Sequence, residues 1–292
     1  MRTNDPQIWL DDFSVPAEQD HKYKRGQVAV LGGVVMTGAA CLVADSAARI
    51  GAGLVTVIAP VLNWQQKLKM PDPLLVYRNF KPHIIARNDI TLRDYAAEKK
   101  EKGQVVCVIG PGLGDDEYKT IRQITGSVLS MDVSVVLDAD GLNAFAGYAE
   151  ELKGYDKLFL TPHDGEFARL FPDHAVLLKT NRVGAAELIA ETLGVTVVLK
   201  GHKTVIAQKG EKTVVNENAP PYLATAGAGD VLAGMIGGLV AQGMSPFEAA
   251  CAAVWIHGEA AEKHGIGLVA SDLPDLIPKV LQEVLGISKN LG

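Results

Sequence analysis

Ala224-Thr225-Ala226-Gly227-Ala228-Gly229-Asp230 is the most informative stretch of this chain, and it runs directly into the apolar segment 231–243. Residues this small let backbone N–H groups approach an anion closely, because almost no side chain stands in the way. A helix that follows would aim its unpaired N-terminal N–H groups and its positive dipole end at the same anion. The stretch therefore predicts a phosphate-binding turn at the start of a helix.

Asp230 stands at the junction of this turn and the helix. Its negative charge does not suit a phosphate ligand, but it suits a base that takes a proton from a hydroxyl group as that group attacks phosphorus. The alternative is an N-capping Asp after a glycine-rich turn. The segment by itself leaves both interpretations open.

On either side of this stretch, short β-branched runs alternate with longer amphipathic runs, which is typical of βαβ units. The predicted strands are 27–31, 54–58, 105–109, 134–137, 157–160, 195–199 and 204–207, and the predicted helices are about 38–50, 117–130, 182–193, 230–242 and 246–264. Because the strands are apolar nearly throughout, we expect an α/β fold with a mostly parallel central sheet and helices on both faces.

No linker or change of composition divides the 292 residues, which predicts a single domain over 1–292. The region 63–94 is the least regular and is expected to be a surface excursion. Three cysteines, Cys41, Cys107 and Cys251, lie in apolar patterns without metal-type spacing, and we expect buried thiols in a reducing compartment.

Composition excludes several classes of protein. Hydrophobic residues make up 48% of the chain and charged residues 21%, which supplies a core and argues against disorder. A net charge of −6 argues against a nucleic-acid partner, which usually requires a basic patch. The longest apolar stretch, 231–241, is well short of the ~20 residues of a membrane helix. The N-terminus has early acids and no apolar signal region, so we expect a cytoplasmic protein with no membrane partner.

Polar and small residues follow the predicted strands where each one ends, and parallel α/β sheets bind ligands beyond the carboxyl ends of their strands. We therefore expect these segments to meet along one rim: Gly32-Gly33 with 37–40, Gly110–Gly114, Asp138–Asn143, Thr161–Phe167 and Lys200–Thr204.

Several common motifs are missing. The chain has no Walker A pattern, no dinucleotide fingerprint after the first strand, no HExxH pair and no Gly-x-Ser-x-Gly elbow. P-loop, Rossmann dehydrogenase, zinc and α/β-hydrolase chemistry are therefore disfavoured. His257 and His264, on the last predicted helix, are interpreted as packed or solvated.

Taken together and in order, the motifs resemble a known family. They are Gly32-Gly33 with 37–40, 49–57, 108–114, 136–143, 160–167, 198–205 and 226–234, and they extend over about residues 20–265. The family is that of the ADP/ATP-dependent NAD(P)H-hydrate dehydratases, of ribokinase-like fold. The chain looks like a bacterial member that stands alone, without the epimerase half of fused relatives.

The resemblance implies a reaction and its cofactors. NADH and NADPH that have become hydrated at C6 of the nicotinamide ring are phosphorylated on that hydroxyl group, and loss of phosphate restores the double bond. The implied phosphoryl donor is ADP, with ATP as the alternative, and the implied metal is Mg²⁺. A homo-oligomer, a tetramer in the family, is also implied. The alanine-rich face 249–253 could serve as its interface, although the core is the stronger interpretation of that face.

The resemblance also implies roles for residues of the site. Asp230 is the base and contacts the hydrate, beside an anion hole made by the N–H groups of Gly227, Ala228 and Gly229. The remaining residues fall into three sets: Lys200, Gly201, His202, Lys203 and Thr204, together with Gly229, for the adenine nucleotide; Ala39, Gly112, Gly114 and His163 for the hydrate; and Glu166 with Asp138 for Mg²⁺, through water. Gly201 is expected to allow a close approach. For Asp140 and Asn143, capping of the helix that follows is an equal alternative to a role in the site.

Two departures from the family are expected to matter. Family members often have Pro where Asp164 stands, and a carboxylate there would weaken nucleotide affinity or help to recruit a metal. The loop 34–37 also differs and would alter the hydrate pocket. Two other functions remain open: a kinase of the same superfamily that acts on a vitamin-precursor alcohol, and a nucleotide-binding sensor without catalysis.

Overall fold

The computed structural model describes residues 1–59, 72–115 and 117–286. Its strands are β1 (Arg2–Thr3), β2 (Gln27–Leu31), β3 (Leu54–Ile58), β4 (Ile85–Arg87), β5 (Val105–Ile109), β6 (Ser134–Leu137), β7 (Leu158–Leu160), β8 (Thr196–Leu199), β9 (Thr204–Ala207) and β10 (Val214–Asn216). Its α-helices are α1 (Thr37–Arg49), α3 (Pro73–Phe80), α4 (Leu92–Lys100), α5 (Tyr118–Leu129), α6 (Asp140–Asn143), α7 (Asp164–Leu170), α8 (Ala175–Thr180), α9 (Arg182–Leu193), α10 (Ala228–Ala241), α11 (Pro246–His264) and α12 (Leu273–Val284).

The ten strands form one sheet in the order β1-β10-β9-β8-β7-β6-β5-β2-β3-β4. All neighbours from β8 to β4 are parallel, and β9 is antiparallel to both β8 and β10. Strand β1, at the start of the chain, pairs with β10 at the edge. The mostly parallel α/β sheet predicted from the sequence is confirmed. The single-domain assignment stays a prediction.

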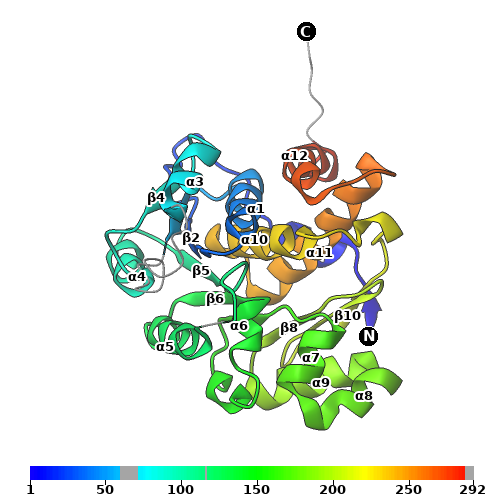
Figure 1. The fold of residues 1–292 in the computed structure, drawn as a ribbon. Helices are drawn as coiled ribbons and strands as arrows, with labels where there is room; N and C mark the ends of the chain where they lie inside the picture. The colour runs from blue at the N-terminus through cyan, green and yellow to red at the C-terminus, as the bar shows by residue number, and fades with distance from the viewer. Residues whose placement is uncertain (60–71, 116, 287–292) are drawn as a thin grey trace.

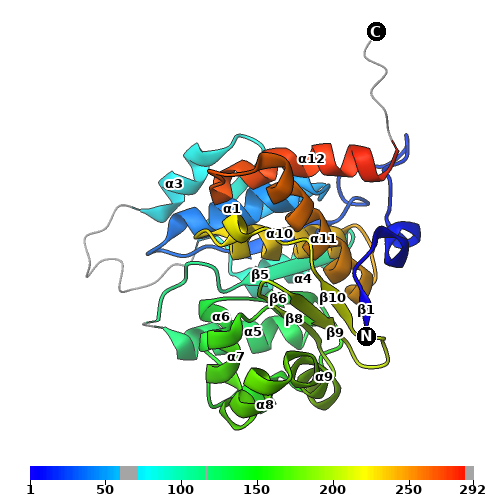
Figure 2. The ribbon, with the colours of Figure 1, turned by 90° about the vertical axis from the view of Figure 1, so that its right-hand side faces the viewer.

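Successive side chains of each central strand lie on opposite faces of the sheet and belong to two different hydrophobic cores. Val28 and Val30 of β2 belong to the core that includes residues of α1, α3, α10, α11 and α12, whereas Ala29 and Leu31 belong to the core that includes residues of α4 to α9. This alternation explains why the strands read as continuous apolar runs, since both faces are covered. Figure 2 shows α1, α10 and α12 on one side of the strands and α5, α8 and α9 on the other.

Helix α10 lies along the middle of the molecule and packs closely against α1 (Figure 1). A Cβ on Gly234 would lie 2.1 Å from Oγ of Ser46, and a Cβ on Gly238 would lie 2.3 Å from a methyl group of Ile50. The two glycines, four residues apart, share one face of α10 and let the helices approach. This contact holds α10 against α1, and the predicted phosphate-binding turn lies just before α10.

Other predictions can be compared with this fold. The three cysteines are buried and unpaired. Ala249–Ala253 are fully buried in the core, so the suggestion of an interface there is wrong. Of the predicted surface excursion 63–94, residues 63–71 lie outside the described residues, and the rest includes α3, β4 and the start of α4. Within the part of the chain that the structure describes, no helix is long and apolar enough to cross a membrane.

Candidate active site

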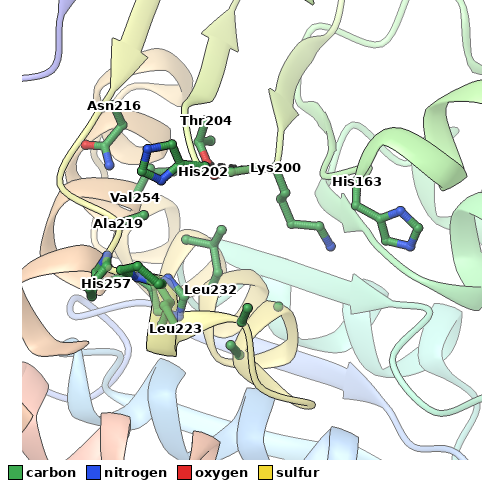
Figure 3. A pocket seen from close by; sticks show the side chains of 16 residues that line it. His163, Lys200, His202, Thr204, Asn216, Ala219, Leu223, Leu232, Val254 and His257 are labelled. Carbon is green, nitrogen blue, oxygen red and sulfur yellow. Dashed lines mark hydrogen bonds between the residues drawn. The ribbon is translucent and has the colours of Figure 1, made fainter. Parts of the chain in front are cut away.

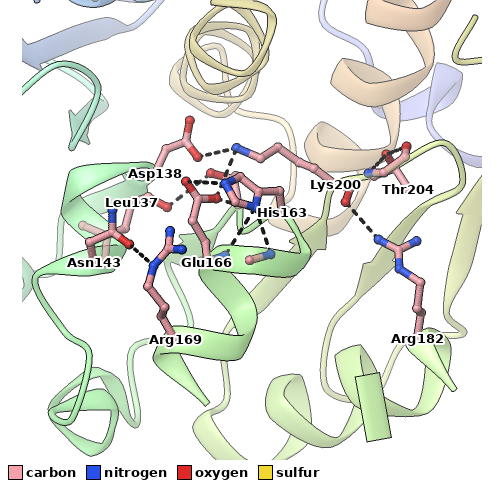
Figure 4. A network of polar contacts seen from close by, with 12 residues as sticks. Leu137, Asp138, Asn143, His163, Glu166, Arg169, Arg182, Lys200 and Thr204 are labelled. Atoms are coloured by element: carbon pink, nitrogen blue, oxygen red, sulfur yellow. Dashed lines mark hydrogen bonds and ion pairs between the residues drawn. The ribbon is translucent and has the colours of Figure 1, made fainter. Parts of the chain in front are cut away.

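The loops that follow β6, β7 and β8 meet at one rim of the sheet, as predicted (Figure 4). The backbone N–H of Lys200 donates to the carbonyl of Pro162 at 2.8 Å, and His163 and Lys200 form a parallel bridge. Nζ of Lys200 then donates to Oδ1 of Asp138 at 2.6 Å. Three strand ends are thus joined by hydrogen bonds, which gives the site a fixed frame.

Helix α10 begins at Ala228, two residues earlier than predicted, and its N-cap is Gly227 with φ of 91°. Asp230 is therefore the third residue of the helix, and the alternative that it caps the helix is wrong. The Ala228 amide donates to the carbonyl of Thr225 at 3.3 Å. In the described residues the amides of Gly229 and Asp230 have no protein acceptor, as expected for a first helical turn. These two N–H groups are available to an anion.

The carboxyl group of Asp230 lies in an environment that disfavours its charge. Burial, followed by the charge of Asp138, raises its pKa from an ordinary value of 3.8 to about 7, although Lys200 acts in the opposite direction. A carboxyl group with such a pKa is poised to exchange a proton near neutral pH, which suits a general base.

Lys200 has the opposite electrostatic role. Burial alone would lower the pKa of its ammonium group, but the charges of Asp138 and Glu166 outweigh that effect and raise the pKa. Nζ of Lys200 lies 3.8 Å from Oε2 of Glu166. A Cβ on Gly229 would lie 3.2 Å from Nζ, so the ammonium group is next to the start of α10. The site therefore places a permanent cation beside the two available amides.

His163 and Glu166 form a capping box at the start of α7. Nδ1 of His163 accepts from the amides of Gly165 and Glu166 at 3.0 and 3.3 Å, and Oε2 of Glu166 accepts from the His163 amide at 2.8 Å. Nε2 of His163 lies 3.4 Å from Oε1 of Glu166. The capping box fixes both side chains, and Nε2 of His163 lies beside the Glu166 carboxylate.

The carboxylates predicted for Mg²⁺ are largely engaged by the protein. Oδ1 of Asp138 holds Lys200, and Oε2 of Glu166 holds the His163 amide. Among residues 1–59, 72–115 and 117–286, no group of three or more His, Cys, Asp or Glu side chains could hold a metal ion. The residues fit an ion that keeps its water and takes its other ligands from a nucleotide, which is the usual habit of Mg²⁺.

A cavity of about 320 Å³ opens beside this frame (Figure 3). Its polar side includes His163, Lys200, Gly201, His202 and Thr204, and its other walls are Asn216, Ala219, Pro220, Pro221, Leu223, Ala224, Ala228, Gly229, Leu232, Val254 and His257. Apolar walls with a few converging polar groups are typical of a small-molecule pocket. Of the predicted nucleotide residues, Lys203 does not line the cavity: its Nζ donates to Oε1 of the exposed Glu217 at 2.6 Å.

His257 was interpreted from the sequence only as packed or solvated. It is 6% exposed and belongs to the wall of the cavity, and its Nε2 has no hydrogen-bond partner among the described residues. Burial lowers its pKa to about 4, so the ring is neutral at physiological pH. A lone histidine on an apolar helix has no distinctive sequence pattern, which is why the sequence did not single it out.

Ala39, Gly112 and Gly114 lie together beside the start of α1. A Cβ on Gly112 would be 3.0 Å from Cβ of Ala39, and a Cβ on Gly33 would overlap the Gly112 carbonyl. The amide of Gly114 donates to Oδ2 of Asp140 at 2.8 Å. These three of the predicted hydrate residues are therefore gathered in one place, while Val35 and Met36 of the divergent loop are exposed.

Asp140 and Asn143 do not cap a helix, so that interpretation is wrong. Asp140 accepts from Gly114, and Oδ1 of Asn143 accepts from Nε of Arg169 at 2.9 Å. The N-cap of α6 is Ala139, whose φ of 48° and ψ of −119° are unusual for a residue with a side chain. The turn that presents Asp138 is held in a strained conformation by these contacts.

Asp164 does not stand free near the phosphate-binding turn, contrary to expectation. Its Oδ1 accepts from Nε and Nη2 of Arg182 at 3.1 and 2.8 Å. The guanidinium group also occupies the space beside Gly201, where a Cβ would lie 2.7 Å from Nη2. The close approach that Gly201 permits in this structure is therefore that of Arg182.

Comparison with known proteins shows the family of the chain. A family model described as NAD(P)H-hydrate dehydratase matches residues 28–282, which is well over half of the chain. An ADP-dependent (S)-NAD(P)H-hydrate dehydratase of Neisseria meningitidis is 38% identical over 264 residues, covering 88% of this chain and 84% of the relative. A bifunctional NAD(P)H-hydrate repair enzyme of Salinibacter ruber is 39% identical over 276 residues, covering 91% of this chain. The chain spans only 50% of the length of that relative.

Solved structures that resemble this chain include a member of the same family. The ADP/ATP-dependent NAD(P)H-hydrate dehydratase of Bacillus subtilis, co-crystallised with ATP and Mg²⁺, is 28% identical with a TM-score of 0.78, covering 97% of this chain and 98% of that one. A ribokinase of Thermotoga maritima is 14% identical with a TM-score of 0.57, and the match covers 88% of this chain and 99% of the ribokinase. At this identity the match shows the fold alone. The chain therefore belongs to the NAD(P)H-hydrate dehydratase family and has the ribokinase-like fold.

Proposed function

We propose that this chain is an ADP-dependent (S)-NAD(P)H-hydrate dehydratase, which restores NADH and NADPH from their hydrates. The observation that carries the proposal is the position of Asp230, third in α10, beside the amides of Gly229 and Asp230 itself, which have no acceptor among the described residues. A base with a pKa of about 7 next to an anion site is what transfer of a phosphoryl group to an alcohol requires.

In this proposal the nucleoside of ADP occupies the cavity of about 320 Å³, with the loop Lys200–Thr204 on one side and the apolar walls on the other. The phosphates extend toward the start of α10, where the amides of Gly229 and Asp230 and the ammonium group of Lys200 favour negative charge. Mg²⁺, when bound with the nucleotide, would neutralise further phosphate charge, and Asp138 and Glu166 would contact its water shell.

The hydrate is placed between the loops of Ala39, Gly112 and Gly114 and the face of His163. The Asp230 carboxylate takes the proton of the C6 hydroxyl group as that oxygen attacks the terminal phosphorus of ADP, and AMP leaves with the electron pair of the broken P–O bond. Loss of a proton from C5 and departure of phosphate from C6 then restore the C5–C6 double bond. The products are AMP, inorganic phosphate and the reduced dinucleotide.

The family match favours this reaction over phosphorylation of a vitamin-precursor alcohol. A hydroxyethylthiazole kinase of Pyrococcus horikoshii, 17% identical with a TM-score of 0.63, shows the fold alone. We do not favour a catalytically inactive sensor, because the raised pKa of Asp230 and its position at the start of α10 support a role as base. The cytoplasmic location and the tetramer stay predictions.

The test is to incubate the protein with hydrated NADH and with ADP or ATP, and to follow both the absorbance of the reduced nicotinamide and the formation of AMP and phosphate. Recovery of absorbance with equal amounts of AMP is expected for ADP. A phosphate ester that accumulates without recovery would identify a kinase instead. Asp230→Asn should bind ADP almost as the wild type does and lower turnover by about 10³-fold or more.

A further inference from the structure

The loop between β8 and β9, residues 200–203, is held from outside by one side chain. Nη1 of Arg182, the first residue of α9, donates to the carbonyl of Lys203 at 2.6 Å, and Nη2 donates to the carbonyl of Lys200 at 2.9 Å. The guanidinium group thus spans the loop from its first to its last residue. Figure 4 shows Arg182 reaching the backbone of Lys200.

Asp164 holds this guanidinium group in place. Its Oδ1 accepts from Nε at 3.1 Å and from Nη2 at 2.8 Å, so a carboxylate at the start of α7 fixes the direction of the Arg182 fork. Arginine loses less freedom per hydrogen bond than lysine does, because its donors have a fixed planar arrangement. The same group therefore connects the start of α7, the start of α9 and the loop.

The inner side of the loop has its own support. Oγ1 of Thr204 donates to the Gly201 carbonyl at 3.0 Å and accepts from the Gly201 amide at 3.3 Å. Because Gly201 has no side chain, the guanidinium group reaches the outer side of the loop without a clash. Gly201 is thus bonded to Thr204 on one side and contacts Arg182 on the other.

The loop is one wall of the nucleotide cavity, to which Lys200, Gly201, His202 and Thr204 contribute. A wall that is ordered before the ligand arrives saves the entropy that ordering would otherwise cost on binding. Resting on the proposed function, we propose that Arg182 is a positioning residue for the adenine nucleotide, and that Asp164 orients it. Arg182 acts through the loop backbone, since it is not among the residues that line the cavity.

The experiment compares three variants with a matched control. Arg182→Met removes the donors and keeps the length of the side chain, Asp164→Asn removes the charge that orients Arg182, and Gly201→Ala pushes the guanidinium group away. The control is Arg87→Met. Arg87 also donates two hydrogen bonds to a carboxylate, that of Asp89. Its side chain is 30% exposed, similar to the 27% of Arg182, and it lies on the edge strand β4.

Three quantities are measured: the dissociation constant for ADP by calorimetry, kcat and KM for ADP and for the hydrate, and amide hydrogen exchange of the loop without nucleotide. Arg182→Met should weaken ADP binding about tenfold or more, because it loses bonds from a charged donor. Its KM for ADP should rise with little change in the KM for the hydrate, and the loop amides should exchange faster. Asp164→Asn and Gly201→Ala should show smaller effects of the same kind. In a double variant with Arg182→Met, either change should add little to the effect of Arg182→Met alone.

The proposal is overturned if folded Arg182→Met binds ADP within about twofold of the wild type, or no more weakly than Arg87→Met does. If Arg182→Met does not fold, unchanged ADP binding in both Asp164→Asn and Gly201→Ala overturns it equally. Failure of the proposed function is a different result: wild-type protein that binds ADP but does not restore the hydrate. The comparison of ADP affinity and loop exchange still decides the role of Arg182 in that case.

Discussion

Nζ of Lys200 lies 2.6 Å from Oδ1 of Asp138, so an ion pair joins the ends of β8 and β6. Asp138 is only 1% exposed, whereas the Lys200 side chain keeps 18% of its surface exposed. A buried carboxylate depends on its partner, because removal of the partner leaves a charge away from water. The pair therefore bears on the stability of the sheet as well as on the charge at the site.

Lys200→Met should lower the free energy of unfolding by about 2–4 kcal/mol, because Asp138 would be left buried without its cation. Adding Asp138→Asn in the same chain should recover most of that loss, since the uncompensated charge is then removed. Urea unfolding of the two single variants and the double variant gives the comparison. Equal stability of wild type and Lys200→Met would contradict the interpretation that the pair is needed by the fold.

The pH dependence of the reaction should report Asp230. The carboxyl group accepts a proton only when it is ionised, and burial together with Asp138 raises its pKa to about 7. We therefore expect kcat/KM for the hydrate to rise with pH through about 7 and then to level off. Asp138→Asn removes a charge that raises this pKa, so the midpoint should move to lower pH. A rate that is flat between about pH 6 and 8 would assign the base elsewhere.

The central strands could be predicted almost residue by residue, because both faces are covered and the sequence reads as uninterrupted apolar runs. β2, β3, β5, β6 and β9 have the predicted bounds. The short strands β1, β4 and β10, of two or three residues, have no such run to identify them. β1 forms only because it pairs with β10, more than two hundred residues away, and a local pattern does not contain that information.

The candidate site was predictable where its chemistry depends on local sequence. Small residues before a helix indicated the anion site, and polar residues after apolar runs indicated the rim. Contacts between distant side chains had no such signal. Arg182 looked like an ordinary first residue of a helix, and only the structure shows that it bonds Asp164 and the loop after β8. Likewise, nothing local marks His257 as part of the cavity.

Asp230 should also reduce the stability of the protein without ligand, in a way that depends on pH. Its pKa is 3.8 when the carboxyl group is unperturbed and about 7 in the folded protein, so the folded state binds the proton more tightly. The resulting stabilisation is complete below pH 3.8 and is lost as the pH rises through about 7.

Asp230→Asn cannot ionise and should not show this loss. The difference in the free energy of unfolding between the variant and the wild type should therefore increase by about 1–3 kcal/mol, in favour of the variant, from pH 5 to pH 8. Denaturant unfolding of both proteins at the two pH values measures the difference. A variant whose stability relative to wild type is the same at both values would show that Asp230 is not desolvated as the structure indicates.

The strained turn after β6 gives a last test. Ala139 has φ of 48°, a region in which a Cβ costs energy and glycine is at ease. Ala139→Gly should raise the free energy of unfolding by about 1 kcal/mol, because relief of strain exceeds the greater entropy that glycine gives the unfolded chain. ADP binding should change little, since the contacts of Asp138 with Lys200 and of Asp140 with Gly114 do not involve the Ala139 side chain. Ala144→Gly, at an ordinary φ of −61°, is the control and should instead lose about 1 kcal/mol, because its buried methyl group is removed. Thermal unfolding of the two variants decides the matter, because equal losses would mean that the backbone at Ala139 is not strained.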